Sequence, residues 1–110
     1  MNTKLIRECG AEFIGTFALV FFGCGSMILY ELNPGAISPD SIPIIFGGII
    51  AVMIYTLGHI SGAHFNPAVS IAFYSVGFVD IKKVALFIPS QVLGAISASL
   101  AHCFFFGNSH

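Results

Sequence analysis

The chain has 110 residues, of which 56% are hydrophobic and only 8% are charged, and its formal net charge is −1. Soluble domains carry roughly 25% charged residues, and so small a domain cannot bury this much apolar surface, which excludes an ordinary soluble protein. The near-neutral charge gives no reason to expect nucleic acid as a partner. We therefore predict an integral membrane protein with one domain, residues 1–110.

The first predicted membrane span covers residues 11–30. Phe13–Tyr30 contains no charged residue, and with Ala11 and Glu12 it reaches the length of about 20 residues that a helix needs to cross a bilayer. The two cations before this run loosely resemble the start of a signal peptide. Because Glu12 interrupts the run, we expect Met1–Tyr30 to be retained.

A second span and a shorter helix are predicted after a turn-rich loop, residues 31–40. No charged residue occurs from Ser41 to Val79. We predict the second transmembrane helix at about 41–58, with Pro43 tolerated in its first turn. Pro67–Ser75 is too short to cross a bilayer, so we interpret residues 59–76 as a re-entrant loop followed by a half-helix.

The third predicted span covers residues 84–106, after a polar link at 77–83 that contains Lys82 and Lys83. On it, the small residues Ser90, Gly94 and Ala98 form a face suited to close helix packing. With three crossings, all four Lys and Arg residues fall on one side of the membrane. The excess of Lys and Arg on cytoplasmic loops then predicts a cytoplasmic N-terminus.

The stretch Gly58–Ser70 is polar, rich in glycine and broken by proline, although it lies inside the uncharged run. Backbone that leaves the helix at membrane depth must be buried in protein or line a water-filled cavity. Asn66 is a preferred N-cap residue and Pro67 suits the first turn of a helix. Such a helix would direct its positive end at the membrane interior, which is typical of transport proteins.

This stretch resembles the first signature loop of the aquaporin family of water and solute channels. Ala11–Thr16 resembles the first-helix motif of the family, Gly23–Ser26 fits its end, and Ser90–Ala95 resembles the third-helix motif, usually written with Ala-Gln. The motifs stand in family order over nearly the whole chain and look closest to bacterial-type water channels. The resemblance implies an all-α membrane protein with three transmembrane helices plus one re-entrant half-helix, one inverted-repeat half of an aquaporin fold. It also suggests a bacterial inner (plasma) membrane as the location.

The resemblance assigns pore residues to the signature loop. The Asn66 amide would donate a hydrogen bond to a passing water molecule and so oppose proton passage, while the small Ala68 would let a second half-helix tip abut the first. Backbone carbonyls of His59–His64, including those of Gly62 and Ala63, would accept hydrogen bonds from water. The side chain of His64 would either line the pore or brace the loop.

Three further residues are candidates outside the loop. Glu12 lies at the edge of a span, where a carboxylate is costly and usually paired, so we expect it to accept hydrogen bonds from loop N–H groups rather than to reach the interface beside Arg7. Gln91 could serve similarly. Phe46 precedes Asn66 by 20 residues, where the family places one member of its narrow filter, and phenylalanine there resembles water-selective members.

The predicted function is passive conduction of water, without catalysis, cofactor or metal, since the cysteines and histidines show no ligand spacing. An aquaporin has two inverted halves, and this chain supplies one: it lacks the second Asn-Pro-Ala and the filter arginine, whose site Val69 occupies. It would therefore be a fragment, pair with a separate C-terminal half, or pair with an antiparallel second copy, which the one-sided Lys and Arg oppose. The alternatives are a facilitator for glycerol or other small neutral solutes, and a non-conducting membrane assembly module.

Overall fold

The structure is a computed structural model that describes residues 2–107, which contain helices and no strand. The order of elements is α1 (Thr3–Ala18), a π-helical segment (Leu19–Cys24), α2 (Gly25–Leu32), a short 3₁₀ turn (Pro34–Ala36), α3 (Ser41–Ser61), α4 (Pro67–Ser75) and α5 (Ile81–Phe106). The predicted all-α fold, three long apolar helices plus one short one, is confirmed.

Three helices are long and apolar enough to cross a membrane: Thr3–Leu32, Ser41–Ser61 and Ile81–Phe106. The first and third begin earlier than the sequence suggested because polar side chains cap them. The Asn2 side chain accepts a hydrogen bond from the Leu5 N–H at 2.7 Å, and Asp80 accepts one from the Lys83 N–H at 2.9 Å. Lys82 and Lys83 therefore belong to the first turn of α5 and not to the preceding link.

The core of the chain lies where α1 crosses α5. Gly94 of α5 faces the α1 backbone so closely that an added Cβ would lie 2.5 Å from the Phe13 carbonyl oxygen. Ala11 on α1 and Ala98 on α5 are also buried. Of the predicted small-residue face of α5, Gly94 is in close contact with α1, whereas Ser90 is only half-buried and donates to the Leu86 carbonyl of its own helix.

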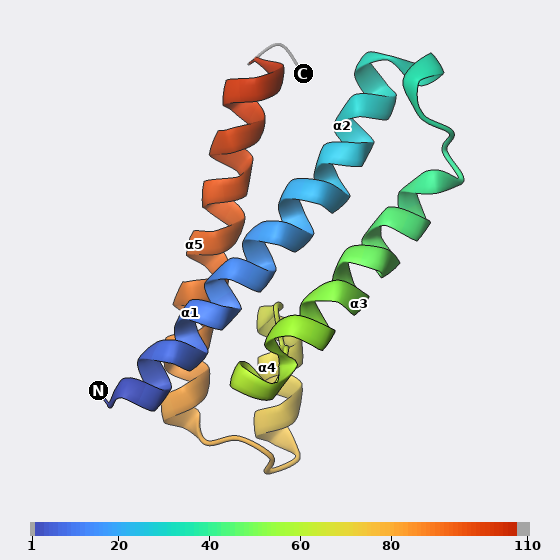
Figure 1. Cartoon of the computed structure of the whole chain (residues 1–110). Helices are drawn as coiled ribbons and strands as arrows, with labels where there is room; N and C mark the ends of the chain where they lie inside the picture. The colour runs from blue at the N-terminus through green and yellow to red at the C-terminus, as the bar shows by residue number, and fades with distance from the viewer. Residues whose placement is uncertain (1, 108–110) are drawn as a thin grey trace.

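The helices place the loop between α3 and α4 inside the molecule. α1 and α5 begin at one end, joined by an ion pair between Lys83 Nζ and Glu8 at 2.8 Å, and α2 ends at the opposite end (Figure 1). After α3 the chain turns back into the molecule, and α4 runs back toward the end at which α1 begins (Figure 1). The longest dimension, 46 Å, is close to the thickness of a bilayer with its headgroups, about 40–45 Å.

Candidate functional site

The loop from Gly62 to Asn66 connects α3 to α4 through three residues with positive φ. Gly62 ends α3 at φ 88°, and its N–H donates to the Gly58 carbonyl at 2.8 Å. Ala63 and Phe65 also have positive φ, 59° and 57°, a region that residues with a Cβ seldom occupy. Such backbone persists only where its surroundings hold it firmly.

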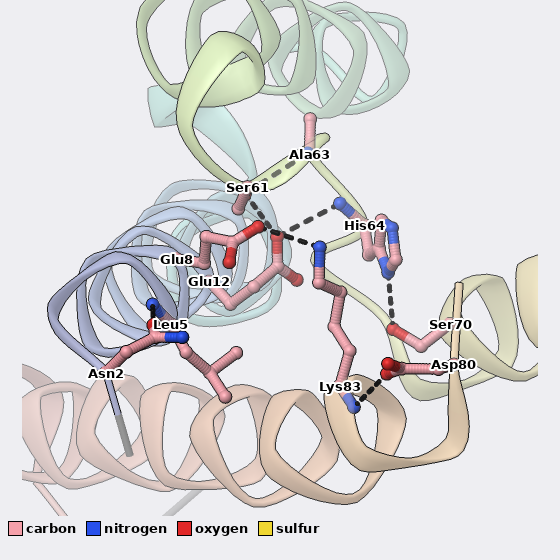
Figure 2. A network of polar contacts seen from close by, with 10 residues as sticks. All are labelled: Asn2, Leu5, Glu8, Glu12, Ser61, Ala63, His64, Ser70, Asp80 and Lys83. Carbon is pink, nitrogen blue, oxygen red and sulfur yellow. Dashed lines mark hydrogen bonds and ion pairs between the residues drawn. The ribbon is translucent and has the colours of Figure 1, made fainter. Parts of the chain in front are cut away.

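Glu12 holds much of this loop backbone in place. The side chain is 0% exposed, and each carboxylate oxygen accepts two hydrogen bonds. Oε2 accepts from the Ser61 hydroxyl at 2.6 Å and from the His64 N–H at 3.1 Å, while Oε1 accepts from the Phe65 N–H at 2.7 Å and from Gln91 Nε2 at 2.7 Å. Figure 2 shows this carboxylate reaching from the first span toward Ser61 and His64. Glu12 therefore does not snorkel to the interface.

Ser70 of α4 connects the rest of the network. Its hydroxyl lies 2.7 Å from His64 Nδ1 and 3.0 Å from Gln91 Nε2, and the first of these contacts is drawn in Figure 2. The His64 ring is buried, with its centroid 4.8 Å from that of Phe73 and 5.0 Å from that of Phe87. Of the two alternatives for His64, the geometry matches bracing, because the ring is enclosed by α4 and α5.

Asn66 caps α4 and remains exposed. Its Oδ1 accepts from the Ala68 N–H at 2.7 Å, and its carbonyl accepts from the N–H groups of Val69 and Ser70 at 3.1 and 3.2 Å. Because the cap uses the side-chain oxygen, both amide hydrogens of Asn66 remain available to a ligand. Pro67 occupies the first helical position, and Ala68 is exposed beside the tip.

The loop also presents acceptors. Among the described residues, no hydrogen bond is made to the backbone carbonyls from His59 to Phe65. This set includes the carbonyls of Gly62, which is exposed, and Ala63, which is half-buried. One short segment therefore offers a neutral donor at Asn66 and a series of neutral acceptors before it.

Phe46 lies elsewhere. It stands about four helical turns from the loop along α3, half-buried, with its ring packed on Gly23 of the π-helical segment. A Cβ added at Gly23 would lie 2.7 Å from Phe46 Cζ and closer still to two other ring atoms. The structure thus brings together Glu12, Gln91, His64 and the loop, but not Phe46.

The sequence reasoning missed Glu8, Ser61 and Ser70. Glu8 and Glu12 stand four residues apart on one face of α1, a like-charge pair that needs partners. Glu8 finds its partner in Lys83 (Figure 2). The two carboxylates on one face of an apolar helix were the available signal for this ion pair. The serines carried no signal, because serine is common in helices of membrane proteins.

A hollow of about 360 Å³ opens beside the tip of α4. Within the described chain, two buried side-chain oxygens have no hydrogen-bond partner, Thr16 Oγ1 and Gln91 Oε1, and both residues line this hollow. Its wall comes from the first span, the loop and α5: Thr16, Leu19, Val20, Phe65, Asn66, Pro67, Gln91, Val92, Ala95 and Ile96.

Comparison with known proteins gives the family. The sequence pattern of the major intrinsic protein family matches residues 1–109. Aquaporin NIP1-1 of Arabidopsis thaliana is 46% identical over 110 residues, which is 100% of this chain and 37% of the plant protein. Aquaporin NIP1-2 of Oryza sativa subsp. japonica is 41% identical over 107 residues, 97% of this chain and 35% of the relative. Nodulin-26 of Glycine max is 39% identical over 99 residues, 90% of this chain and 36% of the relative.

The chain thus spans little more than a third of the length of these relatives. They are plant proteins, so they lend no support to the expected likeness to bacterial-type channels, and a bacterial membrane stays a prediction. The aquaporin resemblance itself is confirmed, because the family match covers nearly every residue. The chain is a membrane protein that belongs to the major intrinsic protein family.

Proposed function

We propose that this chain forms one half of a passive pore that conducts water. The observation that carries the proposal is the capped tip of α4. Asn66 is exposed, its Oδ1 accepts from the Ala68 N–H, and its amide hydrogens therefore remain available to a ligand. A water molecule that accepts from this amide turns both its hydrogens outward and cannot accept from the next water. Together with the positive end of α4, this arrangement opposes the passage of protons and cations.

The neutrality of the loop surface supports water rather than an ion as the permeant species. Among residues 2–107, the carboxylate that binds the loop is that of Glu12, which is 0% exposed and surrounded by four donors. The surface that remains consists of the Asn66 amide and backbone carbonyls. These groups can exchange hydrogen bonds with water at little cost. Backbone carbonyls alone could coordinate a cation, but the Asn66 amide and the positive end of α4 beside them disfavour one.

The other site residues take supporting roles in this proposal. Gln91 and the His64 ring brace the loop, while Ala68 leaves room for a second half-helix tip. Phe46 forms part of the narrow wall from the far end of α3. The N-terminus is cytoplasmic, because the ends of α1 and α5 that carry Lys4, Arg7, Lys82 and Lys83 lie together.

A second half must complete the pore. Alone, the chain would leave Asn66 and the loop carbonyls to lipid, at several kcal/mol for each unsatisfied group. The partner would be the remainder of a longer chain, a separate C-terminal half, or an antiparallel second copy. A role as a non-conducting membrane assembly module is the alternative. The same neutral surface would also admit glycerol or other small neutral solutes.

The test is stopped-flow light scattering of vesicles that contain the purified chain. Asn66→Asp keeps the capping oxygen but removes the amide hydrogens and adds a charge, so we expect water permeability per chain to fall about tenfold. Asn33→Asp adds the same charge in the exposed loop after α2 and should leave the permeability unchanged. Wild-type permeability equal to that of empty vesicles would mean that the chain alone is an incomplete half and that two copies of it do not form a pore.

A further inference from the structure

The side chain of Phe65, the residue before Asn66, lies in a notch on the first span; the notch is the space left by the missing side chain of Gly15. The Phe65 ring packs directly over Gly15 of α1: a Cβ added at Gly15 would lie 2.6 Å from Phe65 Cζ and closer still to Cε1 and Cδ1. Real Cβ atoms do not approach other atoms so closely. Phe65 is 5% exposed, so only glycine at position 15 leaves room for its ring in this place.

Phe65 is held at its backbone as well. Its N–H donates to Glu12 Oε1 at 2.7 Å, and its φ of 57° leaves the loop little freedom to move without breaking that bond. Glu12 and Gly15 lie three residues apart on α1, on neighbouring turns of one helix face. One face of α1 therefore fixes both the backbone and the ring of the residue that precedes Asn66.

We propose that Gly15 is a positioning residue that sets the place of the Asn66 amide through the Phe65 ring. The inference rests on the proposed function, since it concerns the placement of the group that would contact water. It goes further by assigning to α1, through a residue that has no side chain, control over how well protons are excluded.

The structure also indicates what a larger residue at position 15 would do. Phe65 borders the hollow of about 360 Å³ beside the α4 tip, which Asn66 and Pro67 also line. A displaced ring can therefore swing into this hollow and draw Asn66 with it, while α1 stays helical. The expected result of Gly15→Ala is thus a misplaced Asn66 more than an unfolded chain.

Four variants test the proposal. Gly15→Ala closes the notch. Gly10→Ala makes the same change on the same helix, where an added Cβ would meet nothing within 4 Å, and so it controls for helix propensity. Phe65→Leu removes Cε1 and Cζ, two of the three ring atoms that the new methyl group would meet. The double variant Gly15→Ala/Phe65→Leu asks whether relieving the clash restores the site.

The first readout is the ratio of proton to water permeability in vesicles loaded with a pH-sensitive dye. Loss of folded channels lowers both fluxes in the same proportion, whereas a displaced Asn66 raises the ratio. We expect Gly15→Ala to raise it about tenfold or more, the double variant to return close to Phe65→Leu, and Gly10→Ala to match the wild type. A Gly15→Ala ratio equal to that of Gly10→Ala would overturn the proposal.

The second readout, hydrogen exchange of the Phe65 amide in detergent, does not depend on conduction. Exchange should become about tenfold faster in Gly15→Ala and slow again in the double variant. If wild-type vesicles pass no water, conduction by the chain alone fails, but this readout still tests the contact between Phe65 and Gly15. Unchanged exchange in Gly15→Ala would overturn that contact whether or not water passes. Should Gly15→Ala fail to fold, rescue by the double variant would support the contact, and failure of both would overturn it.

Discussion

At the scale of single residues, the site depends on the buried carboxylate of Glu12, each of whose oxygens accepts two hydrogen bonds. A buried carboxylate is destabilising unless its oxygens receive hydrogen bonds that replace those of water. Glu12 receives four, two of them from backbone N–H groups in the part of the loop with unusual φ. The same bonds that make the charge tolerable therefore hold the strained backbone in place.

Replacing Glu12 with alanine should accordingly destabilise the loop. The change leaves the N–H groups of His64 and Phe65 without an acceptor, at a cost of roughly 1–3 kcal/mol for each buried donor. We expect a clear fall in the thermal unfolding temperature in detergent, measured by circular dichroism. Glu31→Ala, at an exposed position at the end of α2, is the control and should change little. An unfolding temperature unchanged in Glu12→Ala would mean that the hydrogen bonds do not stabilise the chain.

At the scale of the elements, the crossing of α1 and α5 sets the distance between the two sides of the network. Glu12 and Gln91 come from these two helices and meet at 2.7 Å. That approach is possible because Gly94 allows the helix backbones to touch. The small residue at the crossing is thus a condition for the polar network and not only for packing.

Gly94→Ala should therefore force the two helices apart. The new methyl group would meet a backbone carbonyl oxygen that cannot rotate away, and overpacking of this kind costs about 1–3 kcal/mol. Gly47→Ala, where an added Cβ meets nothing within 4 Å, should instead gain up to about 1 kcal/mol from helix propensity. The two variants should move the unfolding temperature in opposite directions, and a shift of the same sign in both would contradict this account of the crossing.

The Glu8–Lys83 ion pair joins the same two helices, from the second turn of α1 to the first turn of α5. Its Lys83 side chain is 30% exposed and its Glu8 side chain 8%, so water screens the pair only in part. We expect Lys83→Gln to lower the free energy of unfolding by about 1 kcal/mol. Lys82→Gln removes an equal charge from the exposed neighbour and should have no comparable effect. A double-mutant cycle with Glu8→Gln measures the coupling, and a coupling of zero would show that the pair does not join the helices.

Sequence patterns predicted the elements better than their ends or their contacts. The uncharged runs located every span, and Asn66-Pro67 located the start of α4 at Pro67, because capping and hydropathy are local properties. The extensions to Thr3, Ser61 and Ile81 depended on caps within polar segments. Local patterns could not predict the hydrogen-bond partners of Glu12 or the packing of Phe65 on Gly15. These contacts join residues that are 49 or more positions apart in the sequence.

At the scale of the whole molecule, the apolar surface is not shared evenly. No residue in the most apolar window of α3 is buried, while 28% of the corresponding windows of the first span and α5 are. α3 contacts the rest of the chain chiefly at the first span, and Tyr55 on it is 88% exposed. The remaining surface of α3 must meet lipid or a second half, and Phe46 shares that helix.

A pore built from this chain alone should therefore conduct water but discriminate poorly among small neutral solutes. Two copies would bring two Asn66 tips to the centre, so the barrier to protons could survive. They would bring no arginine to the narrow wall, because Arg7 is the only arginine. It lies near the start of α1, whereas Phe46 lies near the start of α3, at the opposite end of the molecule (Figure 1). Without a fixed cation and its donors, the wall near Phe46 would select by width alone. We expect a higher ratio of glycerol to water permeability than in a full-length aquaporin reconstituted in the same vesicles, measured by stopped-flow light scattering with both gradients. Fast water flux with strict exclusion of glycerol would contradict this account of the narrow wall.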